Sequence, residues 1–127
     1  NRSNDGNDDC CPPKKNIKFL FPGDSGWFDG LYEIGEKYGP YDLAACPIGI
    51  YTPEHFMKPC HMSPDDAVRM MTAIKAKKAI PIHWGTFCLA AESIIEPKDR
   101  LEKAMENAGL DKSTFPAWFI GDTIVSS

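Results

Sequence analysis

Short apolar runs alternate along the chain with longer stretches that have helical periodicity. The apolar runs, rich in β-branched and aromatic residues, predict strands over 17–21, 43–47, 79–82 and 115–120. Between them, apolar residues spaced three and four positions apart predict helices over 28–38, 64–74 and 97–108. Strands and helices in this order are typical of an α/β fold, in which helices cover a mostly parallel sheet.

The helix over 64–74 has the clearest signals. Ser63 suits the N-cap and Pro64 the first helical position, and two acidic residues follow in the first turn. The lysines at 75, 77 and 78 are expected to complement the negative end of the helix dipole. The apolar residues that share one face of this helix are Ala67, Met70, Met71 and Ile74.

Two of the predicted strands lead into a residue that can bind a metal. Asp24 follows the strand over 17–21, and His83 follows the strand over 79–82, where Pro81 indicates an edge or irregular position. Functional groups in open α/β sheets gather beyond the carboxyl ends of the strands, and a carboxylate and an imidazole suit zinc or iron. Taken alone, Asp24 fits an ordinary turn residue and His83 a strand cap that hydrogen-bonds locally. Together they predict a site at the rim of the sheet.

A catalytic zinc site needs a third protein ligand, and His61 is the candidate in this sequence. It lies just before the N-cap Ser63, at a helix end that favours anions such as phosphate, although the acidic first turn weakens that preference. His55 has no partner that the sequence reveals, and a solvated position suits it best.

Composition limits the classes of function. Residues 1–16 are rich in Asn, Asp and Ser and predict a disordered polar tail or linker, which leaves 17–127 as one domain. A net charge of −4 without a basic run argues against nucleic acid, and no apolar stretch approaches the roughly 20 residues of a membrane span. The five cysteines form no Cys-x-x-Cys pair and are odd in number, which favours a reducing, intracellular compartment.

Several linked motifs carry a resemblance to a known family. The run FPGDSG at 21–26 resembles the Gly-Asp-Thr-Gly motif of the metallo-β-lactamase superfamily. The runs IGEKYGPYDLA at 34–44, HMSP at 61–64 and IHWGTF at 82–87 resemble the N-acyl-phosphatidylethanolamine-hydrolysing phospholipase D branch of that superfamily. The likeness covers about 17–122, nearly all of the chain after the tail.

The resemblance implies roles for individual residues. Asp24 matches the carboxylate that bridges two zinc ions, and His83 matches the last histidine ligand. His61 matches a catalytic histidine near the scissile phosphodiester. The implied reaction is zinc-assisted hydrolysis of a phospholipid to an N-acylethanolamine and phosphatidic acid. Candidate lipid-contacting residues, for which core packing is the alternative, are Trp27, Phe56 and Met57.

The sequence departs from that superfamily in one respect. The His-x-His-x-Asp-His motif and a further upstream histidine have no counterpart in the chain, which therefore resembles a C-terminal half. The expected fold is half of a four-layer αββα sandwich, a mixed sheet covered by helices on one face. We expect the isolated chain to bind zinc weakly or not at all and to be inactive.

The expected partners follow from that half-domain. They are the missing N-terminal half, a phospholipid substrate in the parent protein, and a second copy bound through the bare sheet face. The expected location is intracellular, with membrane association possible. The alternative class of function is a non-catalytic module that self-associates or binds a partner through that face.

Overall fold

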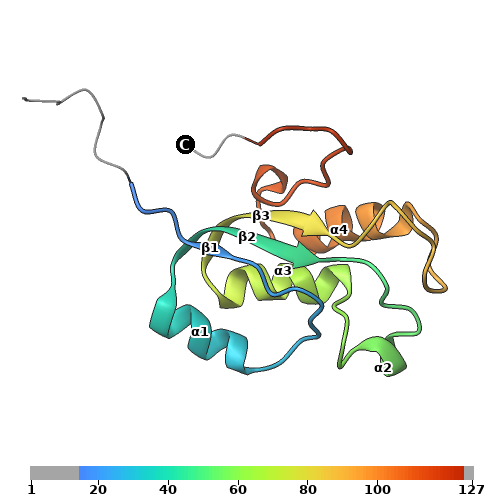
Figure 1. Ribbon diagram of the computed structural model, residues 1–127, viewed down its shortest axis with the longest axis horizontal. Helices are drawn as coiled ribbons and strands as arrows, with labels where there is room; N and C mark the ends of the chain where they lie inside the picture. Colours follow the sequence, from blue (N-terminus) through green and yellow to red (C-terminus); the bar gives the residue numbers. More distant parts are fainter. Residues whose placement is uncertain (1–14, 125–127) are drawn as a thin grey trace, which may run out of the picture.

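A three-stranded parallel sheet organises residues 15–124, the part of the chain that the computed structural model describes (Figure 1). The strands β1 (Phe19–Leu20), β2 (Tyr41–Pro47) and β3 (Ala76–Ile82) lie in the order β1–β2–β3. Leu20 lies opposite Ala44, and Ala44 lies opposite Ala79, so one row of side chains crosses the whole sheet. The α/β class is confirmed. Of the two positions that Pro81 predicted, edge or irregular, the structure shows the edge, because β3 is an outer strand of this sheet.

Helix α3 (Pro64–Ala73) packs directly on the sheet and begins as the sequence predicts. The Ser63 hydroxyl accepts a hydrogen bond from the Asp66 backbone N–H at 3.2 Å, which caps one of the free amides of the first turn. The four apolar residues predicted to share a face are all buried. The prediction that Lys75, Lys77 and Lys78 complement the dipole of α3 is wrong, because none of them lies in the last turn of that helix. Lys75 has a φ of 58° and turns the chain into β3, which contains Lys77 and Lys78.

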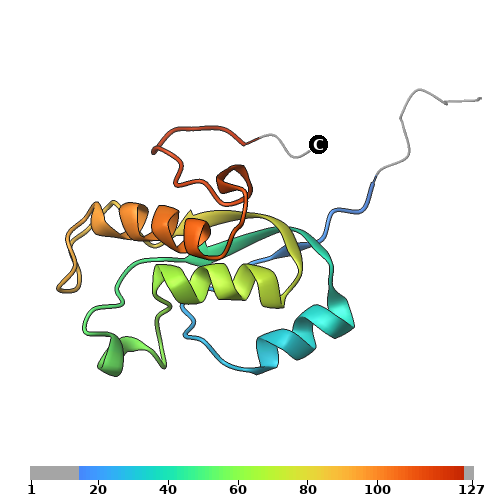
Figure 2. The same cartoon turned by 180° about the vertical axis from the view of Figure 1, so that it is seen from behind.

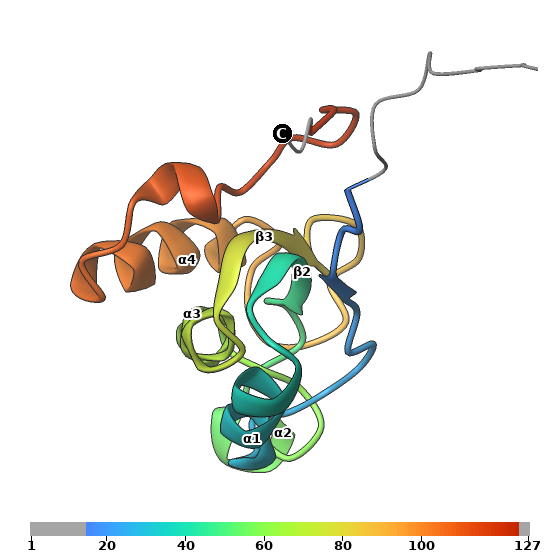
Figure 3. The same ribbon diagram turned by 90° about the vertical axis from the view of Figure 1, so that its left-hand side faces the viewer.

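Helices α1 (Gly30–Tyr38) and α4 (Glu96–Asn107) pack against α3 in the same layer, and the short helix α2 (Glu54–Met57) precedes α3. Figure 2 shows α3 and α4 in front of the sheet, and Figure 3 shows the helices on one side of the strands. The largest fully buried side chains between these layers include Ile48, Met62, Met70, Ile74, Leu101 and Met105.

The other face of the sheet carries exposed apolar side chains. Leu20 packs against the core, so Phe19 and Phe21, one position away on either side, point to the opposite face. Phe19 is 50% exposed and Phe21 is 61% exposed. Leu43 and Lys78 lie in register with Phe19 across the sheet and share its face. This bare face matches the expectation of a partial sandwich.

Two predictions about the sheet need correction. The run 115–120 is no strand: a short 3₁₀ helix, η1 (Lys112–Thr114), precedes it and a turn ends it. Phe115 is buried in the core. The Phe119 N–H donates to the Asp122 carboxylate at 2.9 Å, a local hydrogen bond in place of one to a neighbouring strand. Among residues 15–124 every strand pairing is parallel, and the mixed character expected of the sheet does not occur there.

Some predictions fall outside the described residues. Of the polar tail predicted over 1–16, residues 1–14, which include Cys10 and Cys11, lie outside the described part of the chain. Within 15–124, no helix is long and apolar enough to cross a bilayer.

Candidate functional site

Asp24 and His83 meet at the rim of the sheet where β1 and β3 end. The His83 Nδ1 atom lies 3.1 Å from an Asp24 carboxylate oxygen. The Asp24 side chain is 73% exposed and that of His83 is 30% exposed, so both can be reached from solvent. The proximity inferred from the two strand ends is therefore present, while their role as metal ligands stays a prediction.

Backbone contacts fix where His83 lies. The Ile48 N–H donates to the Ile82 carbonyl at 3.1 Å, which extends the pairing of β2 with β3 by one step. At Gly49 the two segments approach so closely that a Cβ would overlap the His83 carbonyl, so only glycine fits. His83 itself has a φ of 60°, in the left-handed region that few non-glycine residues adopt. The imidazole is thus held by an unusual backbone turn and not only by its side-chain contact.

A hollow of about 330 Å³ opens beside this pair. Its lining includes the polar pair Asp24 and His83, and its walls are mainly apolar, with Phe87 73% exposed and Leu89 67% exposed. Such a combination suits a ligand with one charged and one apolar part. The residues that line the hollow are Asp24, Ile50, His83, Trp84, Thr86, Phe87 and Leu89.

The pair fits part of a zinc site. Two ligands of one tetrahedral zinc ion, each about 2.0–2.2 Å from the metal, lie roughly 3.3–3.5 Å apart. The observed separation of 3.1 Å between Asp24 and His83 is close to that value. Within residues 15–124, no group of three or more His, Cys, Asp or Glu side chains is arranged to hold a metal.

His61 lies on a segment that packs against the Asp24 turn. A Cβ on Gly26 would overlap the backbone of Lys58 and Pro59, so the chain just after Asp24 touches the chain just before His61. The Nδ1 atom of His61 is buried and has no hydrogen-bond partner among the described residues. His61 does not line the hollow beside His83. Its catalytic role stays a prediction.

The proposed lipid-contacting residues also lie outside the hollow's lining. The Arg69 guanidinium lies 3.8 Å from the ring centre of Trp27, and the indole N–H donates to Asp29 at 3.3 Å. These contacts attach Trp27 to α3, which agrees with the packing alternative. Phe56 is 73% exposed at the surface of α2, next to the half-buried Met57.

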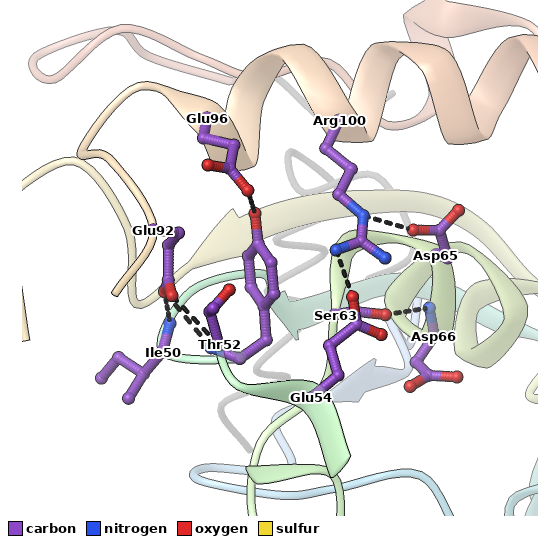
Figure 4. Close-up of polar contacts among 10 residues, drawn as sticks. Ile50, Thr52, Glu54, Ser63, Asp65, Asp66, Glu92, Glu96 and Arg100 are labelled. Carbon is purple, nitrogen blue, oxygen red and sulfur yellow. Dashed lines mark hydrogen bonds and ion pairs between the residues drawn. The ribbon is translucent and has the colours of Figure 1, made fainter. Parts of the chain in front are cut away.

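Sequence reasoning missed Glu92, a buried acid on the loop between β3 and α4, whose contacts are drawn in Figure 4. Its carboxylate accepts hydrogen bonds from three successive backbone N–H groups, those of Ile50 at 2.5 Å, Tyr51 at 3.2 Å and Thr52 at 3.0 Å. Burial acts to raise the pKa of Glu92, but hydrogen bonds from its own backbone and from Thr52 and Ile50 outweigh burial and hold the pKa below its usual value. No sequence motif announces this contact, because its partners are backbone amides about forty residues away.

Arg100 extends the polar contacts from this loop to the helices (Figure 4). Its guanidinium pairs with Glu54 and with Asp65, at 2.7 Å for the latter, and lies 4.9 Å from the ring centre of Tyr51. The Tyr51 hydroxyl donates to Glu96 at 2.8 Å. Burial and the Glu96 carboxylate raise the pKa of Tyr51, so this hydroxyl stays protonated at neutral pH.

Comparison with known proteins now assigns the family. A model of the β-lactamase superfamily domain matches residues 13–84, which include both Asp24 and His83. The chain belongs to the β-lactamase superfamily. This chain is similar to the solved structure of a novel metallo hydrolase from the hyperthermophilic archaeon Ignicoccus hospitalis, with a TM-score of 0.54 at 26% identity, covering 80% of this chain and 37% of that one. The fold is that of this superfamily, in part.

Two superfamily relatives are similar in sequence over most of the chain. One is N-acyl-phosphatidylethanolamine-hydrolyzing phospholipase D 1 of Caenorhabditis elegans, 47% identical over 94 residues, which are 72% of this chain and 26% of the relative. The other is the mitochondrial N-acyl-phosphatidylethanolamine-hydrolyzing phospholipase D of Saccharomyces cerevisiae, 38% identical over 89 residues, which are 68% of this chain and 19% of the relative. The chain thus spans about a quarter of the length of the worm relative and less of the yeast relative. The comparisons support a metallo-β-lactamase-type hydrolase.

Proposed function

We propose that this chain forms the C-terminal part of a zinc-dependent phosphodiesterase that acts on N-acylated phospholipids and releases an N-acylethanolamine and phosphatidic acid. The observation that carries the proposal is the contact of Asp24 with His83 at the mouth of the hollow. The names of the worm and yeast relatives support the choice of substrate. The remaining metal ligands would come from an N-terminal half, which is the proposed partner of this chain.

Asp24 and His83 are the residues that would hold the metal. When bound, zinc would act as a Lewis acid toward a phosphoryl oxygen and lower the pKa of a water molecule. The Nδ1 atom of His83 faces Asp24, so its Nε2 atom remains for a second contact. His61, whose buried Nδ1 has no partner among residues 15–124, would contact the phosphodiester beside this pair.

The apolar walls of the hollow would receive the lipid part of the substrate. Phe87 and Leu89 project from the loop that follows His83, and both are largely exposed. A phospholipid substrate requires this mouth to face a membrane, so we propose an intracellular, membrane-associated location. Phe56 and Met57 on α2, together with Trp27, are the proposed further lipid contacts.

The test is an assay of the longer parent protein that the proposal requires. The protein is incubated with vesicles containing N-acyl-phosphatidylethanolamine, and released N-acylethanolamine is measured before and after chelation. Asp24→Ala and His83→Ala are each expected to lower the rate by at least about 100-fold, because loss of a partner that only supports a metal ligand already costs about 10–100-fold. His55→Ala, on the exposed start of α2, is the control and is expected to retain the rate. Full activity in both site variants would exclude the metal assignment.

A second function rests on the bare sheet face. Phe19, Phe21 and Ile17 are each at least half exposed, and such apolar patches mark interaction surfaces. We propose that without its N-terminal half the chain pairs with a second copy, or another partner, through this face. Light scattering of the purified chain is expected to show an average mass that rises with protein concentration. Phe21→Ser is expected to lower that mass. A monodisperse monomer at high concentration would exclude self-association.

A further inference from the structure

The Glu92 carboxylate fills a nest of backbone amides that begins at Ile50, a residue that lines the hollow. Three consecutive N–H groups, those of Ile50, Tyr51 and Thr52, all point to its two oxygens. Concave arrangements of successive amides bind anions, and here the anion is a side chain of the same molecule. Glu92 is only 8% exposed. Because both oxygens are engaged and buried, Glu92 is not itself available to a metal or a substrate.

The nest depends on a strained residue. Ile50 has a φ of 63°, a conformation that β-branched side chains strongly disfavour. Residues in such conformations persist only where the surrounding structure determines them. The shortest hydrogen bond of the nest, at 2.5 Å, comes from the N–H of Ile50 itself. Glu92 is therefore the contact placed to hold this turn.

The strained turn is in backbone contact with His83. Gly49, the residue before Ile50, lies against the His83 carbonyl so closely that no Cβ fits between them. His83 also has a positive φ, of 60°, so both sides of this contact have unusual backbone conformations. A change in the turn at Ile50 must therefore displace Gly49, and with it the backbone that aims the His83 imidazole at Asp24.

Glu92 also fixes the far wall of the hollow. It lies on the loop that carries Phe87 and Leu89, and its carboxylate attaches that loop to the segment after β2. Ile50 lines the hollow from the other side of the same attachment. One buried carboxylate thus joins the two walls of the hollow to each other.

We propose that Glu92 is a positioning residue for the rim site: through the Ile50 turn and Gly49 it sets the orientation of the His83 imidazole toward Asp24. Any effect of this orientation on metal binding rests on the proposed function. The positioning itself does not, and it can be measured in the metal-free chain.

The test compares Glu92→Gln with Glu96→Gln by NMR at one fixed pH. Glutamine keeps the size of the side chain but places an NH₂ donor against the nest, whereas Glu96→Gln changes only the bond to the Tyr51 hydroxyl. The signals are the imidazole C–H resonances of the three histidines, assigned by single substitutions. In folded Glu92→Gln we expect the His83 resonance to shift or broaden while that of His55 stays. In Glu96→Gln we expect both to stay.

A second substitution tests the route through Ile50. Glycine adopts a positive φ without strain, so Ile50→Gly in the Glu92→Gln background is expected to return the His83 resonance toward its original position. A merely destabilised protein would not show this recovery, because the resonance reports the folded state alone. An unmoved His83 resonance in folded Glu92→Gln, or no recovery in the double variant, would overturn the proposal.

Hydrogen exchange in the unaltered chain covers the case in which Glu92→Gln does not fold. If Glu92 holds the turn, the amides of Ile50 and Thr52 are protected at least about tenfold, as expected for a hydrogen bond to a charged group. Exchange of these amides at the unprotected rate would overturn the proposal. None of these readouts involves metal, so failure of zinc to bind the complete protein would count against the proposed function alone.

Discussion

Two polar clusters lie on the two sides of the close backbone contact between Gly49 and His83, and they differ in almost every physical respect. The Asp24–His83 pair is exposed and is joined by a single contact of 3.1 Å. Glu92 is 8% exposed, and three amide donors occupy its carboxylate. The comparison teaches that the exposed pair is free to bind something else, whereas the buried acid stabilises the scaffold around it.

The largest expected difference between the clusters is in stability. Glu92→Ala leaves three amide donors without their acceptor and should lower the free energy of unfolding by about 3 kcal/mol. Asp24→Ala, at a side chain 73% exposed, should change it by less than about 0.5 kcal/mol. Urea denaturation of both variants measures this directly. Similar losses for the two would break the distinction between site and scaffold.

A smaller effect is expected at Arg100, which joins the scaffold to α2 and α3. Arg100→Met loses the pairs with Glu54 and Asp65, and because the side chain is 30% exposed we expect a loss of only about 1–2 kcal/mol. The control is Lys98→Met on the same helix, whose pair with Glu102 spans 4.0 Å and should contribute less than about 0.5 kcal/mol. Thermal unfolding of both variants tests whether Arg100→Met loses more stability than Lys98→Met. An equal fall in Tm would show that the Arg100 pairs contribute no more than a surface pair.

Acid should weaken the scaffold gradually. The pKa of Glu92 is lower in the folded chain than in the unfolded chain, so its contribution is complete above the unfolded pKa of about 4.3 and is lost as the pH falls toward the folded value. The free energy of unfolding between roughly pH 6 and pH 3 measures this loss. Glu92→Gln should reduce the slope in that range. An unchanged slope would mean that Glu92 has no shifted pKa.

Local signals in the sequence were sufficient for the three longer helices and for the strands that alternate with them, but not for the short helix α2. The cap at Ser63 and the apolar spacing of α3 depend on neighbours in sequence, and both are confirmed. The run 115–120 was misread because a strand needs a paired neighbour, and nothing in an apolar run shows whether one is present. Phe115 fills the core instead.

The site could be predicted only in outline. The proximity of Asp24 and His83 could be predicted from the order of strands and helices, because the carboxyl ends of parallel strands meet at one edge of the sheet. The role of Glu92 could not be predicted from the sequence, because it depends on backbone amides and on the positive φ of Ile50, which is unusual for isoleucine. The lining residues Phe87 and Leu89 lie on a loop whose course no periodicity indicates.

The central claim is that Asp24 and His83 are metal ligands, and metal content tests it most directly. The longer parent protein, purified with and without each substitution, is examined by elemental analysis alongside His55→Ala and Asp99→Ala, which alter exposed residues of the same types. The account predicts full zinc in the parent and both controls, and a clear loss of zinc in Asp24→Ala and in His83→Ala. Unchanged zinc in both site variants would contradict it.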